Sequence, residues 1–188
     1  LKSIAPSMGL GTETTNGIPI PPLYYNDMVA VDDIPRLNKF FSDEMGLEIA
    51  QTMSIAREPE KVERLLMVQE EKLSARLVNS SRMAKEMLSA KPHIVLPLKY
   101  IESDYSVELT EADMKRSMVG WMARVKSLIK ECLEASPEAP EILFITGGMS
   151  LSPIVQQEIK AMLPHLPVVT ADAFKSISEG LSIQANKL

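Results

Sequence analysis

The spacing of apolar side chains predicts helices through the middle of the chain. From Pro59 to about Leu88 apolar residues recur every three or four positions, so we predict one long helix with a single buried face. A shorter helix is expected over about 36–55, with Gly46 as the point where it is interrupted. Another is expected from Glu111 to about Glu134, with Thr110 as its cap.

Short apolar runs predict strands on both sides of the last of these helices. His93–Leu98 and Ser106–Leu109 are expected to be two strands joined by a turn at 102–104. Glu141–Thr146 encloses an uninterrupted apolar run, which is typical of a strand buried on both faces.

The last fifty residues alternate strands with helices. Ser152 and Pro153 suit the start of a helix that reaches about Leu163. A short strand at 167–170 and a last helix over about 171–185 are expected to follow. A strand–helix–strand–helix order predicts an α/β fold with a parallel sheet and a right-handed crossover.

Residues 1–35 are rich in proline and turn formers, so we expect an irregular, mostly extended segment there. The pattern leaves two alternatives open. The segment is either a frayed end or an arm packed on the body of the protein, and Leu23, Tyr24, Tyr25 and Val29 favour the arm.

Composition and charge narrow the class of protein. The chain has 188 residues, 45% of them hydrophobic, and a net charge of −5, which argues against a general nucleic-acid binder. No apolar run approaches the roughly 20 residues of a membrane helix, so no membrane partner is expected.

A single cysteine, Cys132, excludes an internal disulfide and fits a cytoplasmic protein. Its helix position predicts a core side chain. Since the chain begins with Leu1, we expect it to be part of a longer protein.

Two short segments carry candidate chemistry. Gly147 and Gly148 stand between a predicted strand and a helix start, where a ligand can approach the backbone and helix amides favour an anion. On these residues alone, a turn needed only for packing is the better explanation. Lys85 and Ser89 stand four apart near a helix end, where they could bind a ribose or base, although a solvated lysine and a terminal serine explain them more simply. His93 and His165 have no ligand-like partners at motif spacing.

Taken together, these segments resemble the nucleotide-binding domain of DnaK-type heat-shock chaperones, which are actin-like ATPases. Lys85-Glu-Met-Leu-Ser89 resembles the K-x-x-L-S element of that family. Strands, a T-x-x-D helix start, Ile142-Leu-Phe-Ile-Thr-Gly-Gly-Met-Ser150 and Val168–Leu181 follow in the family's order. Arg57-Glu-Pro-Glu-Lys-Val62 is similar to the YegD-like branch, as are Gly17–Pro22, Ala30–Pro35 and Asp172–Ile177. The resemblance covers nearly the whole chain.

The resemblance implies the C-terminal portion of the second lobe of an actin-like (ribonuclease-H-like) ATPase. Residues 1–35 would be an arm, 36–135 the upper helical and small-sheet subdomain, and 136–188 part of the lower subdomain. The implied contacts to adenosine come from Lys85, Ser89, Gly147, Gly148, Met149, Ser150 and Leu151. The family binds ATP or ADP with magnesium between two lobes, and unfolded or partner proteins elsewhere.

Several departures from the family pattern limit this expectation. Arg82 stands where the family usually has glutamate, and Leu151 where it usually has an arginine that stacks on adenine. The two phosphate loops, D-x-G and D-x-G-G-G-T, do not occur, so this chain alone is expected neither to bind nucleotide tightly nor to hydrolyse ATP. No peptide-binding β domain is recognised after the last helix, so a DnaK-like clamp is not expected here.

Three hypotheses about function therefore remain open. The chain is a fragment of an ATP-binding, DnaK-like molecular chaperone, which supplies the adenosine side of the site and lacks the phosphate and magnesium half. Alternatively, it is a non-enzymatic interaction module on the same fold, or an autonomous domain with an unrelated ligand.

Overall fold

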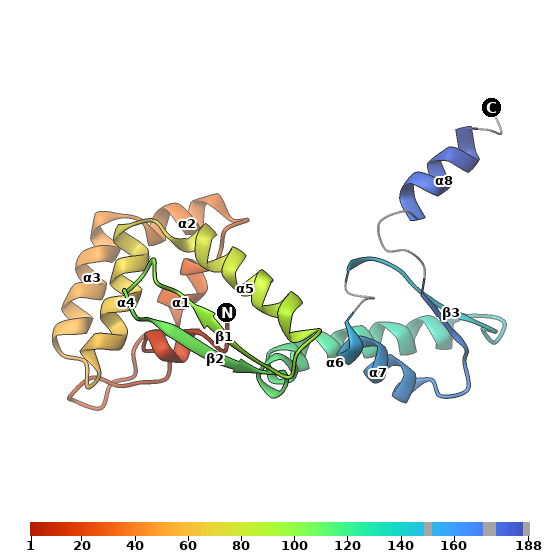
Figure 1. The fold of residues 1–188 in the computed structure, drawn as a ribbon, viewed down its shortest axis with the longest axis horizontal. Coiled ribbons are helices and arrows are strands. Elements are labelled where there is room, and N and C mark those ends of the chain that lie inside the picture. The colour runs from red at the N-terminus through yellow and green to blue at the C-terminus, as the bar shows by residue number, and fades with distance from the viewer. Residues whose placement is uncertain (149–151, 171–175, 186–188) are drawn as a thin grey trace. The chain divides into compact units, whose positions relative to one another are not determined.

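The computed structural model describes residues 1–148, 152–170 and 176–185. The chain forms two compact units, Leu1–Ser117 and Met118–Leu188. In chain order the elements are η1 (Ala5–Met8), α1 (Pro22–Met28), α2 (Ile34–Phe40), α3 (Asp43–Ser54), α4 (Pro59–Glu70), α5 (Ser74–Leu88), β1 (His93–Pro97), β2 (Ser106–Thr110), α6 (Glu111–Ala135), β3 (Leu143–Ile145), α7 (Pro153–Met162), β4 (Val168–Thr170) and α8 (Ser176–Ala185) (Figure 1).

The N-terminal segment is a packed arm. Met8, Ile20 and Met28 are completely buried, and so are the rings of Tyr24 and Tyr25. The Tyr25 hydroxyl donates a hydrogen bond of 2.9 Å to the Met8 carbonyl. The expectation of a mostly extended segment is wrong, because α1 begins at Pro22, and proline favours the first turn of a helix.

The region expected as one helix over 36–55 contains two, α2 and α3. The chain breaks at Phe41 and Ser42, and the Ser42 hydroxyl caps α3 by accepting a hydrogen bond of 3.3 Å from the Met45 amide. Gly46 does not interrupt α3. A Cβ at Gly46 would lie 2.9 Å from Gln69 Oε1. Because glycine has no Cβ, α4, which carries Gln69, can pack closely against α3.

The long helix predicted over 59–88 is also two helices, α4 and α5. The break lies at Lys72, whose φ of 53° is left-handed. Leu73 N–H donates to the Val68 carbonyl at 3.0 Å and Lys72 N–H to the Gln69 carbonyl at 3.3 Å, the two bonds of a Schellman C-cap. The apolar spacing continues across this turn, which is why the spacing alone did not reveal it.

The predicted hairpin of the first unit is confirmed. β1 and β2 pair antiparallel, with Val95 opposite Glu108. Ile94 and Leu109 pair across the two strands, and both side chains are buried, whereas the residues next to them in each strand are more exposed. β1 packs against α5 (Figure 1). The loop between the strands is held to the helices by Arg76, which stacks 4.2 Å from the Tyr100 ring centroid.

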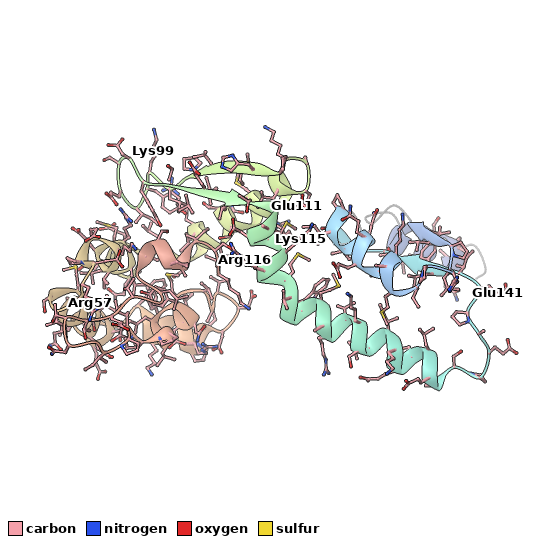
Figure 2. The ribbon with its side chains drawn as sticks, turned by 90° about the horizontal axis from the view of Figure 1, so that it is seen from below. Arg57, Lys99, Glu111, Lys115, Arg116 and Glu141 are labelled. Atoms are coloured by element: carbon pink, nitrogen blue, oxygen red, sulfur yellow. The ribbon has the colours of Figure 1, made fainter. Side chains whose placement is uncertain are left out.

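The predicted start of α6 at Thr110 is confirmed. The Thr110 hydroxyl accepts a hydrogen bond of 3.2 Å from the Asp113 amide, and Asp113 Oδ2 accepts one of 2.9 Å from the Thr110 amide. These reciprocal bonds form a capping box. One turn further, Lys115 pairs with Glu111 at 2.6 Å (Figure 2).

The second unit contains the predicted parallel pairing of β3 with β4. Leu143 and Ile145 pack with Met122 of α6 and Val155 and Ile159 of α7. Phe144 and Ile142 remain 57% and 55% exposed. The expectation of a strand buried on both faces is therefore wrong, because the described residues cover only one face of this two-stranded sheet.

Candidate functional site

The glycine pair follows β3 directly, as predicted. Gly147 has a φ of 92°, a left-handed conformation that favours glycine. Gly148 has no such constraint, and a Cβ built on it would meet no described atom within 4 Å. Gly147 is therefore explained by its backbone, whereas neither conformation nor crowding among the described residues explains Gly148.

The start of α7 lies just beyond this turn. Ser152 is the N-cap residue and Pro153 the first helical residue, both as predicted. The Ser152 side chain makes no capping bond, contrary to the expected cap. Its hydroxyl is buried and has no hydrogen-bond partner among the described residues, and such an unsatisfied group is costly.

Lys85 and Ser89 lie one turn apart at the end of α5, as predicted. Ser89 is the C-cap residue, and its hydroxyl donates a hydrogen bond of 3.1 Å to the Lys85 carbonyl. The serine oxygen retains lone pairs with which to accept a further bond. On the same helix, Arg82 Nε lies 3.5 Å from Glu86 Oε1, and both side chains are well exposed.

The predicted site residues are divided between the two units. Lys85 and Ser89 belong to Leu1–Ser117, and the glycine pair belongs to Met118–Leu188. Met149, Ser150 and Leu151 lie outside the described residues. Each half is therefore characterised by itself.

Other candidate groups contribute structure. Burial raises the pKa of Tyr25, and its hydroxyl is held by the backbone. His93 Nε2 lies 3.7 Å from Glu108 on the exposed face of the hairpin. Within the described ranges, no three His, Cys, Asp or Glu side chains gather to hold a metal ion. Across the same residues, no helix has the length and apolar content needed to cross a bilayer.

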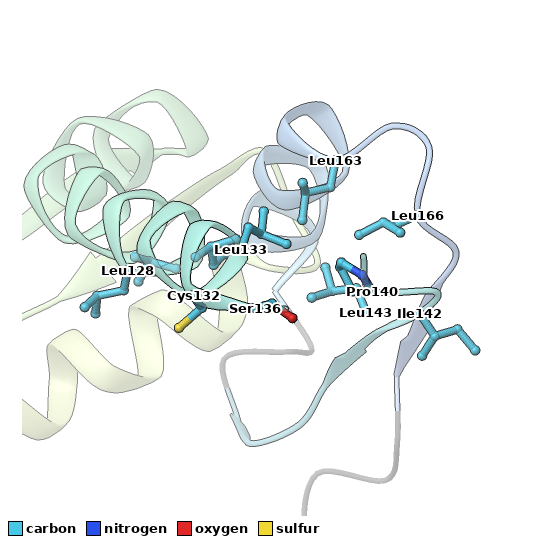
Figure 3. A pocket seen from close by; sticks show the side chains of 11 residues that line it. Leu128, Cys132, Leu133, Ser136, Pro140, Ile142, Leu143, Leu163 and Leu166 are labelled. Carbon is cyan, nitrogen blue, oxygen red and sulfur yellow. The ribbon is translucent and has the colours of Figure 1, made fainter. Parts of the chain in front are cut away.

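The expectation for Cys132 is wrong, since this cysteine is exposed. It belongs to a second apolar row on α6, formed with Val125 and Leu128, which lines an open groove rather than the core (Figure 3). The sequence signal for this row is an apolar surface on the helix that is too wide for one buried face.

Comparison with known proteins decides the family. The family model described as Hsp70 protein matches residues 50–188. The chain belongs to the Hsp70 family. This confirms the family resemblance and implies an actin-like fold, of which the described residues show a mainly helical α/β part with two small sheets. Neither comparison distinguishes the YegD-like branch, which stays a prediction.

A curated relative supports the same assignment. The chain is 24% identical over 119 residues to a protein from Shewanella denitrificans named chaperone protein HscA homolog. The match covers 62% of this chain but spans only about a fifth (19%) of that protein's length. Hsp70 proteins bind ATP with magnesium and act on client proteins. Membership of this family relates the chain to molecular chaperones.

Proposed function

We propose that this chain supplies the adenosine side of an Hsp70-type nucleotide site within an ATP-binding chaperone. The observation that carries the proposal is Gly148, a glycine in open space that the described backbone and packing do not require. Glycine is required at such a position if a ligand lies so close to the backbone that a Cβ atom would collide with it. Its position after a strand of a parallel sheet is where α/β folds bind ligands.

The neighbouring residues fit the same ligand class. In this proposal the backbone of Gly147, Gly148, Met149 and Ser150 faces the ribose and phosphate, and Leu151 borders the base. Ser152 supports the proposal, since its buried hydroxyl has no hydrogen-bond partner among the residues that the structure describes. A polar ligand group or an ordered water would satisfy it.

Lys85 and Ser89 are proposed to contact the ribose or the base from the end of α5. The lysine offers donors, and the serine oxygen, although it donates to the Lys85 carbonyl, can still accept. This proposal places residues 36–135 in the upper subdomain of the second lobe and 136–188 in the lower one, with 1–35 as an arm.

In this proposal, magnesium and the phosphates are bound by residues outside these 188. The described carboxylates form no cluster suited to a metal, and the D-x-G loops do not occur in the 188 residues. Since phosphoryl transfer depends on metal-assisted positioning, ATP hydrolysis would require a longer protein that carries those loops. A cytoplasmic location follows as part of the same proposal.

The test is calorimetric titration of ADP and ATP, with magnesium, into the 188-residue chain and into any longer product of its gene. We expect weak or no binding by the chain alone and clear binding by the longer protein. Gly148→Val should weaken nucleotide binding by about tenfold or more, because the valine side chain would keep the ligand away from the backbone. Lys85→Ala should weaken it by a similar factor, because it removes a charged hydrogen-bond donor. Gly120→Ala, in open space on α6, and Lys39→Ala, an exposed lysine of α2, are matched controls expected to change nothing.

The second candidate is a non-enzymatic interaction module that has lost nucleotide binding. Arg82 favours it, because a guanidinium that already pairs with Glu86 stands where the resemblance predicts a ribose-binding carboxylate. Absence of nucleotide binding in the longer protein would overturn the first proposal and support this one. Binding that Gly148→Val abolishes would overturn the second.

A further inference from the structure

One face of α5 carries a row of charged and polar side chains near the end of the helix (Figure 1). The row has four members, spaced as i, i+3, i+4 and i+7: Arg82, Lys85, Glu86 and Ser89. Residues at this spacing lie on one side of a helix. The buried residues of α5 lie on a different side. Arg82 therefore belongs to the same face as Lys85 and Ser89, the two residues proposed to contact the ribose or the base.

The Arg82 guanidinium is exposed and only weakly held. Its side chain is 73% exposed, and Arg82 Nε lies 3.5 Å from Oε1 of Glu86, whose side chain is 64% exposed. An exposed ion pair at this spacing stabilises a helix only slightly, and less so when the basic residue precedes the acidic one. A ligand anion can therefore replace Glu86 as the partner of this guanidinium.

A guanidinium and a carboxylate recognise different forms of a ribose. A carboxylate accepts hydrogen bonds from free ribose hydroxyls, whereas a guanidinium has five donors and no acceptor. The planar fork of arginine matches a phosphate group with two parallel hydrogen bonds. In dinucleotide-binding folds, an acidic residue beside the ribose binds the free 2′-hydroxyl, and an arginine there accommodates a 2′-phosphate. An arginine beside a ribose therefore predicts a phosphorylated ribose.

We propose that Arg82 makes this protein selective for adenine nucleotides that carry an additional phosphate on the ribose, at the 2′ or the 3′ oxygen. The guanidinium binds that phosphate, and the ammonium group of Lys85 adds positive charge on the same face of α5. This inference rests on the proposed function, because it requires that the end of α5 faces the ribose. In this proposal Arg82 is a specificity-determining residue of the nucleotide site.

Two simpler explanations of Arg82 give different expectations. A solvated arginine that only balances the negative end of the helix dipole would not distinguish one nucleotide from another. A protein that has lost nucleotide binding would bind neither the plain nor the phosphorylated form. Selectivity for a ribose phosphate that depends on Arg82 is expected from the proposal alone.

The test compares nucleotides that differ by one phosphate. ADP, 2′-phospho-ADP and 3′-phospho-ADP, each with magnesium, are titrated calorimetrically into the longest product of the gene that contains these 188 residues. We expect one of the two phosphorylated forms to bind about tenfold or more tightly than ADP, as a charge-assisted contact provides. The preferred form identifies the oxygen that carries the phosphate. Added salt should reduce the difference.

Three variants and a control separate the role of the guanidinium from general charge. Arg82→Ala should bind all three nucleotides with similar Kd values. Arg82→Glu should reverse the order, because a carboxylate accepts hydrogen bonds from free hydroxyls and repels a phosphate. Glu86→Gln should tighten binding of the preferred form, since it removes a like charge and a competing partner. Arg57→Ala is the control, because Arg57 is another exposed arginine that pairs with an exposed glutamate, Glu13, at 3.3 Å.

The outcomes distinguish this inference from the proposed function. Equal Kd values for ADP and both phosphorylated forms would overturn the inference and leave the proposed function intact. Selectivity that survives Arg82→Ala would assign the phosphate to another residue and would also overturn it. If none of the three nucleotides binds, the proposed function fails and the inference fails with it. Circular dichroism checks that each variant is folded.

Discussion

At the scale of single residues, Asp113 is the side chain with the clearest electrostatic role. The Thr110 hydroxyl, the Thr110 amide and the Arg116 guanidinium together hold the pKa of the Asp113 carboxyl below its ordinary value. A carboxyl whose folded pKa is lowered contributes stability above its unfolded pKa of about 3.9, and this contribution is lost as the pH falls through the folded value.

We therefore expect Asp113→Ala to reduce the free energy of unfolding by about 1 kcal/mol at pH 7. The difference from the wild type should be smaller at about pH 2 than at pH 7, because the contribution of the Asp113 carboxylate is lost as the pH falls through its folded pKa. Urea denaturation at the two pH values measures it. Glu111→Ala, in the same first turn and with a side chain 42% exposed, removes the ion pair with Lys115. It is the control and should cost at most about 0.5 kcal/mol. An Asp113→Ala deficit that is equal at both pH values would contradict the assignment.

At the scale of elements, the turn between α4 and α5 is closed by a lysine where glycine is usual. Lys72 holds a left-handed φ of 53°, which costs a residue with a Cβ on the order of 1 kcal/mol. Lys72→Gly should therefore raise the free energy of unfolding by up to about 1 kcal/mol, less the entropy that glycine adds to the unfolded chain.

Chemical denaturation of the variant gives the test, and Lys39→Gly gives the contrast. Lys39 lies in the last turn of α2, so glycine there should lower the free energy of unfolding by up to about 1 kcal/mol. If both variants lose stability, the left-handed lysine is not strained.

The predictable elements were those with a local chemical signal. The β1–β2 hairpin has its alternation, α6 has the Thr110 cap, and α7 has Pro153 at its first turn. The break at Lys72 has no local chemical signal in the sequence, because the Schellman hydrogen bonds use only backbone groups and the apolar spacing continues through the turn. The exposure of Phe144 could not be predicted either, since burial of a strand depends on how many layers cover its sheet.

The candidate site was predictable only in part for the same reason. The order of the Lys85 and Gly148 segments was sufficient for the family, which the Hsp70 match confirms. The buried Ser152 hydroxyl, which has no partner among the described residues, and the groove beside Cys132 both depend on long-range packing, so no short sequence segment predicts them.

At the scale of the whole molecule, the aromatic residues divide between the two units. All four tyrosines, Tyr24, Tyr25, Tyr100 and Tyr105, lie in Leu1–Ser117, whereas the single tryptophan, Trp121, lies in Met118–Leu188. Most of the described buried apolar side chains also belong to the first unit. Each unit therefore has its own spectroscopic reporter and a different amount of core.

We expect Trp121 fluorescence to change at a lower urea concentration than the near-ultraviolet circular dichroism of the tyrosines. The reason is the smaller core of the second unit, whose sheet has one uncovered face among the described residues. Coincident transitions from the two probes would instead show that α6, which is shared by both units, makes unfolding cooperative.

The uncovered face of β3 also has a consequence for aggregation. Ile142–Thr146 is a short segment of high β-propensity without charge or proline, the composition that stacks into cross-β assemblies when its edge is unpaired. Pro140 and Glu141 precede it and the glycine pair follows it. Residues of these kinds act as gatekeepers that interrupt stacking. Gly147 and Gly148 therefore have a second effect, because they end the apolar segment and so limit the length of an aggregation-prone strand.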